Sequence, residues 1–62
     1  MQGYASDLHK NTILIVDDDD AVRALASSAL EQDGFQVIMA SKGHDGLELF
    51  RTRHPDLVIL DL

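Results

Sequence analysis

Carboxylates gather at two places in the sequence, each directly after a short apolar run. In "ILIVDDDD", residues 13–20, four apolar residues lead into four aspartates, and in "DLVILD", residues 56–61, an apolar run leads to Asp61. Crowded carboxylates repel one another unless a cation lies between them. Mg²⁺ suits such a place, because it binds through one or two carboxylates and keeps several waters. Asp17, Asp18 and Asp61 are therefore the candidate metal ligands.

A metal held by carboxylates also suits phosphoryl transfer, in which the metal neutralises charge on the transferring group while a carboxylate attacks it. In that chemistry Asp61 is the attacking group, and Asp17 and Asp18 hold the metal. A simpler interpretation exists for residues 17–20 alone, since helix starts attract aspartate and a solvated capping loop would look the same. Asp19 and Asp20 fit that simpler interpretation, as capping or rim charge.

Strands and helices in alternation must position these carboxylates. Residues 12–16 form a continuous apolar and β-branched run, which predicts a strand buried on both faces of a parallel sheet. A helix over residues 21–32 follows, capped by Asp19 or Asp20, with Gly34 suited to a left-handed residue after its end. Its apolar stripe consists of Val22, Leu25, Ala26, Ala29 and Leu30.

The second half of the chain repeats this alternation. A strand is predicted over residues 35–40, a helix over 42–53 with Ser41 as its cap, and a strand over 56–60. His54 and Pro55 end the second helix, because proline disfavours helical geometry in the residue before it. Met39 and Phe50 are expected in the core. Strand, helix, strand, helix, strand with short connections is typical of an α/β fold with a parallel three-stranded sheet.

If the strands that end at residues 17 and 61 are neighbours, their carboxylates meet at one edge, because ligands of parallel sheets lie beyond the carboxyl ends of the strands. An apolar last strand at a sheet edge also invites pairing with another chain. The sequence therefore predicts a homo-oligomer through the exposed edge of the strand over 56–60.

Composition narrows the class of protein further. The chain has 62 residues, no cysteine and a formal net charge of −6, and its five basic residues do not cluster. We expect no direct nucleic-acid contact, no membrane span and a cytoplasmic protein. Residues 1–11 read as a polar lead-in.

The stretch "ILIVDDDDAVRALASSALEQDGFQVIMASKGHDGLELFRTRHPDLVILDL" resembles the first half of a response-regulator receiver domain of two-component signalling. The resemblance covers residues 12–62 and implies a truncated flavodoxin-like fold, strand order 2-1-3-4-5 in the whole domain. It further implies that Asp17 and Asp18 are the acidic pair that binds Mg²⁺, and that Asp61 accepts phosphate from a sensor histidine kinase or phosphotransfer protein. The chain would then be a phosphoacceptor, not an enzyme.

Departures from the family leave alternatives open. Asp20 stands where many members have proline, and the family's Ser or Thr, aromatic switch residue and lysine would lie beyond Leu62, so the chain is expected to be incomplete and unable to signal alone. Residues 13–22 also resemble the first motif of haloacid-dehalogenase-type phosphatases, with Asp17 as nucleophile and Asp19 as acid/base. A third interpretation is an inert structural fragment.

Overall fold

A computed structural model of the chain describes residues 11–61. The polar lead-in predicted for residues 1–11 lies outside this range except for Asn11. The elements, in chain order, are β1 (Thr12–Asp17), α2 (Asp20–Gln32), β2 (Gln36–Ala40), α3 (Gly43–Arg53) and β3 (Leu57–Asp61). Each differs from its predicted range by about one residue at either end.

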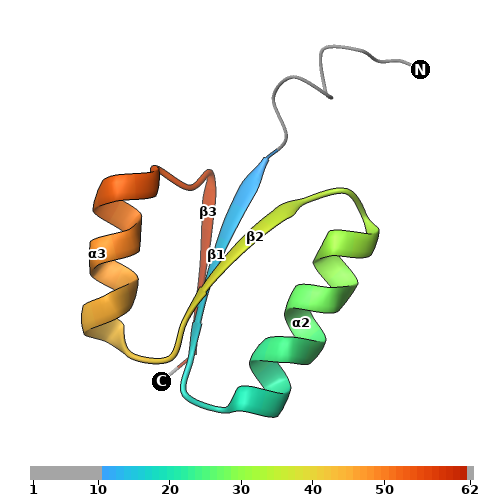
Figure 1. The fold of residues 1–62 in the computed structure, drawn as a ribbon, viewed down its shortest axis with the longest axis horizontal. Coiled ribbons are helices and arrows are strands. Elements are labelled where there is room, and N and C mark those ends of the chain that lie inside the picture. Colours follow the sequence, from blue (N-terminus) through green and yellow to red (C-terminus); the bar gives the residue numbers. More distant parts are fainter. Residues whose placement is uncertain (1–10, 62) are drawn as a thin grey trace.

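The three strands form a parallel sheet in the order β2-β1-β3, which confirms the predicted α/β class (Figure 1). β1 is the central strand, with Val16 beside Ala40 of β2 and Leu60 of β3. The helices α2 and α3 lie on opposite faces of the sheet, and both contact β1 and β2 but not β3. One edge strand is therefore left without a helix on either face.

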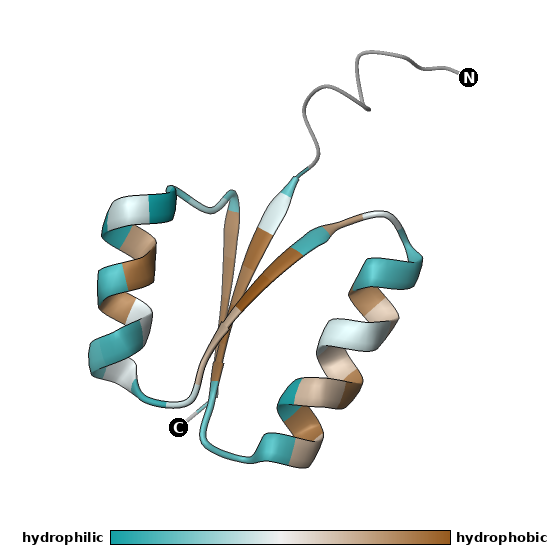
Figure 2. Cartoon of the chain, viewed as in Figure 1, coloured by the Kyte–Doolittle hydropathy of each residue, from teal (hydrophilic) through white to brown (hydrophobic). Residues whose placement is uncertain are grey.

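β1 forms the centre of the core, and its residues from Ile13 to Val16 are buried. On the α3 side, Leu14 and Val16 pack with Ala40, and two partly buried residues, Ile38 and Leu49, pack against this cluster. Figure 2 shows the apolar residues concentrated along the strands of the sheet. A strand with helices on both faces must be apolar throughout, which is why the run before Asp17 does not alternate.

Two of the core predictions are wrong. Met39 and Phe50 are both about half exposed, although both helices pack against β2, the strand that carries Met39. The predicted apolar stripe of α2 is also mostly exposed: Leu25 is 75% exposed, whereas Ser27 is buried. The cause is the position of α2 over β1 and β2, which leaves much of its stripe with nothing opposite it.

The helix ends match the sequence in three places out of four. Asp19 is the N-cap of α2. The other end of α2 is a Schellman motif: the Phe35 N–H donates to the Leu30 carbonyl, and the Gly34 N–H donates to the Glu31 carbonyl. Gly34 has the positive φ, +94°, that this motif requires. His54 adopts a left-handed conformation and ends α3 before Pro55, as expected. The prediction of Ser41 as the cap of α3 is wrong: the helix begins at Gly43, and Lys42 occupies the N-cap without a side-chain hydrogen bond.

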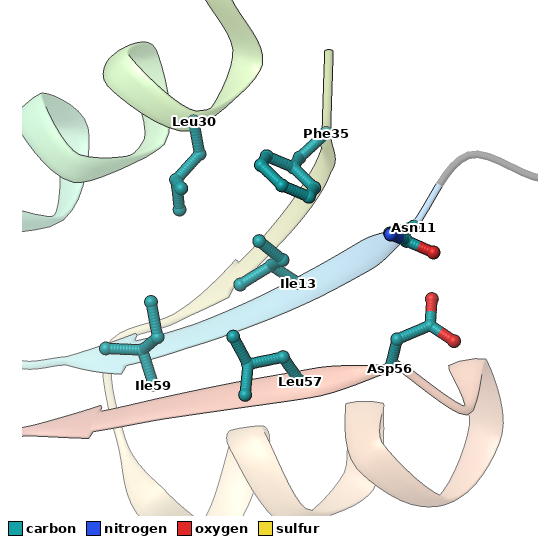
Figure 3. Close-up of a pocket in the computed structure, with 7 residues that line it drawn as sticks. All are labelled: Asn11, Ile13, Leu30, Phe35, Asp56, Leu57 and Ile59. Carbon is teal, nitrogen blue, oxygen red and sulfur yellow. The ribbon is translucent and has the colours of Figure 1, made fainter. Parts of the chain in front are cut away.

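A hollow of about 350 Å³ lies on the α2 side of the sheet, next to β3 (Figure 3). Its apolar lining comes from β1, β3 and the end of α2, and Asn11 and Asp56 lie at one end of it. All of β3 is at least partly solvent-exposed, with Leu60 at 59%. The predicted homo-oligomer through this strand stays a prediction.

Over residues 11–61, neither helix has the length and apolar character needed to cross a membrane.

Candidate functional site

The carboxyl ends of β1 and β3 bring Asp17 and Asp61 together. The two aspartates are register partners at the ends of neighbouring parallel strands, and such strands lie about 4.8 Å apart. Because paired residues of parallel strands face the same way, both side chains start from the same face of the sheet. We call Asp17–Asp20 together with Asp61 the acidic rim.

Asp17 is the only buried carboxylate of the rim, at 6% exposed. Its Oδ1 accepts a hydrogen bond of 2.9 Å from the Asp19 N–H, and its backbone carbonyl accepts one of 2.7 Å from Nη1 of Arg23. No donor from residues 11–61 bonds to Oδ2. A buried carboxylate oxygen without a partner is costly, and a cation is the kind of partner that removes the cost.

Asp19 has a structural task. Its Oδ1 accepts from the backbone N–H groups of Ala21 and Val22, at 3.0 and 3.1 Å, and so satisfies the free donors at the start of α2. This supports the simpler interpretation of Asp19 as a cap. It also leaves the phosphatase alternative without a free acid/base at this position.

Asp20 pairs with Arg23, three residues later on α2. Its Oδ1 lies 2.6 Å from Nη2 of Arg23, and the Asp20 side chain is 89% exposed. An exposed ion pair of this kind contributes little to stability. Its effect is local, because it holds one rim carboxylate against a guanidinium.

Asp18 is exposed and accepts no hydrogen bond from the described part of the chain. The four consecutive aspartates thus separate into two kinds. Asp19 and Asp20 are engaged by α2, whereas Asp18 and the Oδ2 of Asp17 accept no hydrogen bond from residues 11–61. Of these two residues, Asp17 is the register partner of Asp61.

The donor chemistry fits Mg²⁺, although no ready-made cluster exists. Within residues 11–61, no three acidic or histidine side chains come close enough together to hold a metal ion. Mg²⁺ usually takes only one or two protein carboxylates and completes its octahedron with water. Asp17, whose Oδ2 has no donor from residues 11–61, and its register partner Asp61 supply two such carboxylates. The assignment of Asp17, Asp18 and Asp61 as metal ligands stays a prediction.

Sequence reasoning missed two residues around the rim and the sheet. Arg23 could have been found from its i,i+3 spacing to Asp20 on a helix. Asp56 ties the start of β3 to β1: its Oδ2 accepts from the Thr12 N–H at 2.7 Å, and its own N–H donates to the Thr12 carbonyl at 2.8 Å. No local pattern predicts the contact between Asp56 and Thr12, because these two residues lie far apart in the sequence.

Comparison with known proteins identifies a matching family. The family described as "Response regulator receiver domain" matches residues 13–62. The transcriptional regulatory protein AfsQ1 of Streptomyces coelicolor is 41% identical over 51 residues, which cover 82% of this chain and 23% of that protein. Regulatory protein AtoC of Escherichia coli is 46% identical over 52 residues, covering 84% of this chain and 11% of AtoC.

A further relative, the transcriptional regulatory protein CseB of Streptomyces avermitilis, is 46% identical over 50 residues, or 81% of this chain and 21% of CseB. The chain therefore spans less than a quarter of the length of each of these relatives.

Proposed function

The chain belongs to the response regulator receiver domains of two-component systems, and from this we propose that it is the phosphoacceptor module of a phosphorelay, with Asp61 as the acceptor. The observation that supports the proposal most is the register of β1 and β3. It sets Asp61 beside Asp17, the buried carboxylate whose Oδ2 has no donor from the described residues. An acceptor carboxylate thus has a second carboxylate next to it, at the open end of the sheet.

The proposed reaction is the transfer of a phosphoryl group from a phosphohistidine. A carboxylate oxygen of Asp61 attacks phosphorus, the P–N bond to the donor imidazole breaks, and an acyl phosphate forms on Asp61 as the imidazole takes the electron pair of the broken bond and a proton. Asp17 and Asp18 would hold Mg²⁺, which when bound neutralises charge on the transferring group. The Asp19 and Arg23 hydrogen bonds keep the backbone around Asp17 in place meanwhile.

The donor partner we propose is a sensor histidine kinase or a phosphotransfer protein, in the cytoplasm. The chain would act as a stoichiometric acceptor and not as an enzyme with turnover.

Phosphorylation of the 62-residue chain tests this function. The chain is incubated with acetyl phosphate and Mg²⁺, and intact-mass measurement followed by peptide mapping locates the added phosphoryl group. We expect modification of Asp61, its loss in Asp61→Asn, and its retention in the matched control Asp56→Asn. Phosphate on Asp17 would support the phosphatase alternative, and no modification would support the inert fragment.

A further inference from the structure

Arg23 joins two parts of the acidic rim. Nη1 donates to the backbone carbonyl of Asp17 at 2.7 Å, and Nη2 donates to Oδ1 of Asp20 at 2.6 Å. The Arg23 side chain is only 18% exposed, although it comes from the first turns of α2. A guanidinium can make two such bonds at once because its donors form a rigid planar fork.

We propose that Arg23 determines which divalent cation the acidic rim prefers, by withholding the Asp20 carboxylate and by fixing the backbone at Asp17, so that Mg²⁺ is favoured over Ca²⁺. This inference rests on the proposed metal site at Asp17, Asp18 and Asp61.

Mg²⁺ and Ca²⁺ differ in the number of carboxylates that they use. Ca²⁺ takes six to eight oxygen ligands and gains from additional carboxylates, whereas Mg²⁺ needs only one or two and keeps its waters. Of the four aspartates at residues 17–20, Asp19 is engaged as a cap and Asp20 is paired with Arg23. The rim therefore offers few free carboxylates, which suits Mg²⁺. Without the Arg23 guanidinium, the Asp20 carboxylate loses its ion pair, and we expect Ca²⁺ to recruit it as a further oxygen ligand.

Arg23 also makes the turn after β1 rigid. A chain of hydrogen bonds runs through the turn: Arg23 Nη1 to the Asp17 carbonyl, Asp19 N–H to the Asp17 carboxylate, and Arg23 N–H to the Asp19 carbonyl at 2.9 Å. Mg²⁺ demands near-ideal octahedral geometry, while Ca²⁺ tolerates flexible sites. Loss of the Arg23 side chain loosens the turn and so removes an advantage that only Mg²⁺ has.

The test is calorimetric titration of the 62-residue chain with MgCl₂ and with CaCl₂, which gives the ratio of the two dissociation constants. In Arg23→Met we expect the preference for Mg²⁺ to fall by about tenfold, the lower end of what outer partners of metal ligands contribute. Arg23→Lys keeps a positive charge beside Asp20 and should recover part of the preference. Arg23→Met combined with Asp20→Asn should recover part of it too, because the released carboxylate is gone.

Asp20→Asn alone is the second variant, for use even if Arg23→Met does not fold. Since Arg23 already withholds Asp20, the ratio in Asp20→Asn should equal that of the wild type. A marked loss of Ca²⁺ affinity in Asp20→Asn, or an unchanged ratio in folded Arg23→Met, would overturn the inference while leaving the metal site intact. Two results would overturn the metal site and this inference together. One is a wild-type chain that binds neither cation, and the other is an Asp18→Asn chain that binds each cation as tightly as the wild type does.

Discussion

Gly46 of α3 lies directly against Val16 of β1: a Cβ atom at Gly46 would be 2.6 Å from Val16 Cγ2 and 3.2 Å from Cγ1. No unstrained side chain fits there, because carbon atoms in contact lie about 3.5–4.0 Å apart. The glycine thus allows α3 to approach the central strand at the residue next to Asp17. The distance between helix and sheet at this point depends on a single missing methyl group.

Gly46→Ala should destabilise the chain by about 1–3 kcal/mol through overpacking, reduced by up to about 1 kcal/mol from the better helix propensity of alanine. Val16 is buried and its β-branched side chain has little freedom to turn away. Gly43→Ala is the control, since nothing lies within 4 Å of a Cβ atom at Gly43. Urea unfolding of the two variants would contradict this account if Gly46→Ala were the more stable.

Asp56→Ala should cost about 1–2 kcal/mol, because it leaves the Thr12 N–H without its carboxylate acceptor. The loss should be greatest at the start of β1 and β3, so the Thr12 amide should exchange its hydrogen faster while that of Leu14 changes less. Asp56→Asn keeps an acceptor oxygen and should fall between wild type and Asp56→Ala. Equal exchange rates at Thr12 in all three chains would show that the hydrogen bond contributes nothing.

Asp19→Ala should lower stability by about 1 kcal/mol, the usual contribution of an N-cap, and Asp19→Ser should restore most of it. Both variants should still be phosphorylated on Asp61, because Asp19 serves α2 and not the reaction. Circular dichroism during thermal unfolding measures the first effect, and intact mass after acetyl phosphate the second. Phosphorylation lost in Asp19→Ser at wild-type stability would restore Asp19 as an acid/base candidate.

Two copies of the chain are expected to associate through the edges of β3. Antiparallel pairing is favoured over parallel pairing, since it keeps the two Asp61 carboxylates apart. It also brings each Asp61 towards the start of the partner's β3, which follows the basic last turn of α3. Leu60→Lys should reduce association in sedimentation velocity, whereas Leu25→Lys, at an exposed position on α2, should not. A wild-type chain that sediments as a monomer at all concentrations would contradict this prediction.

Local patterns were enough to predict the order of the elements and the edge at which Asp17 and Asp61 meet. An apolar run that ends in aspartate, twice, within alternating strands and helices, leaves few other arrangements. The Asp19 cap and the left-handed Gly34 also follow from rules that involve only a few neighbouring residues.

What could not be predicted depends on what lies opposite each side chain. The spacing from Val22 to Leu30 shows that α2 has an apolar stripe, but not that Leu25 is largely exposed while Ser27 is buried. For the same reason no local pattern marks Gly46 as a point of close contact with Val16. Such facts come from tertiary packing, which periodicity does not encode.

The position of β3 bears on the order of folding. β1 pairs with β2 across a shorter stretch of chain than it does with β3, although the difference in loop-closure entropy is under about 1 kcal/mol. The helices have the larger effect on the order of folding, because both pack against β1 and β2 and neither contacts β3. β3 should therefore dock last and detach first in local unfolding. Since β3 carries Asp61, any ligand that bridges Asp61 and Asp17 would hold β3 against β1 and slow the local unfolding of the least protected strand of the sheet.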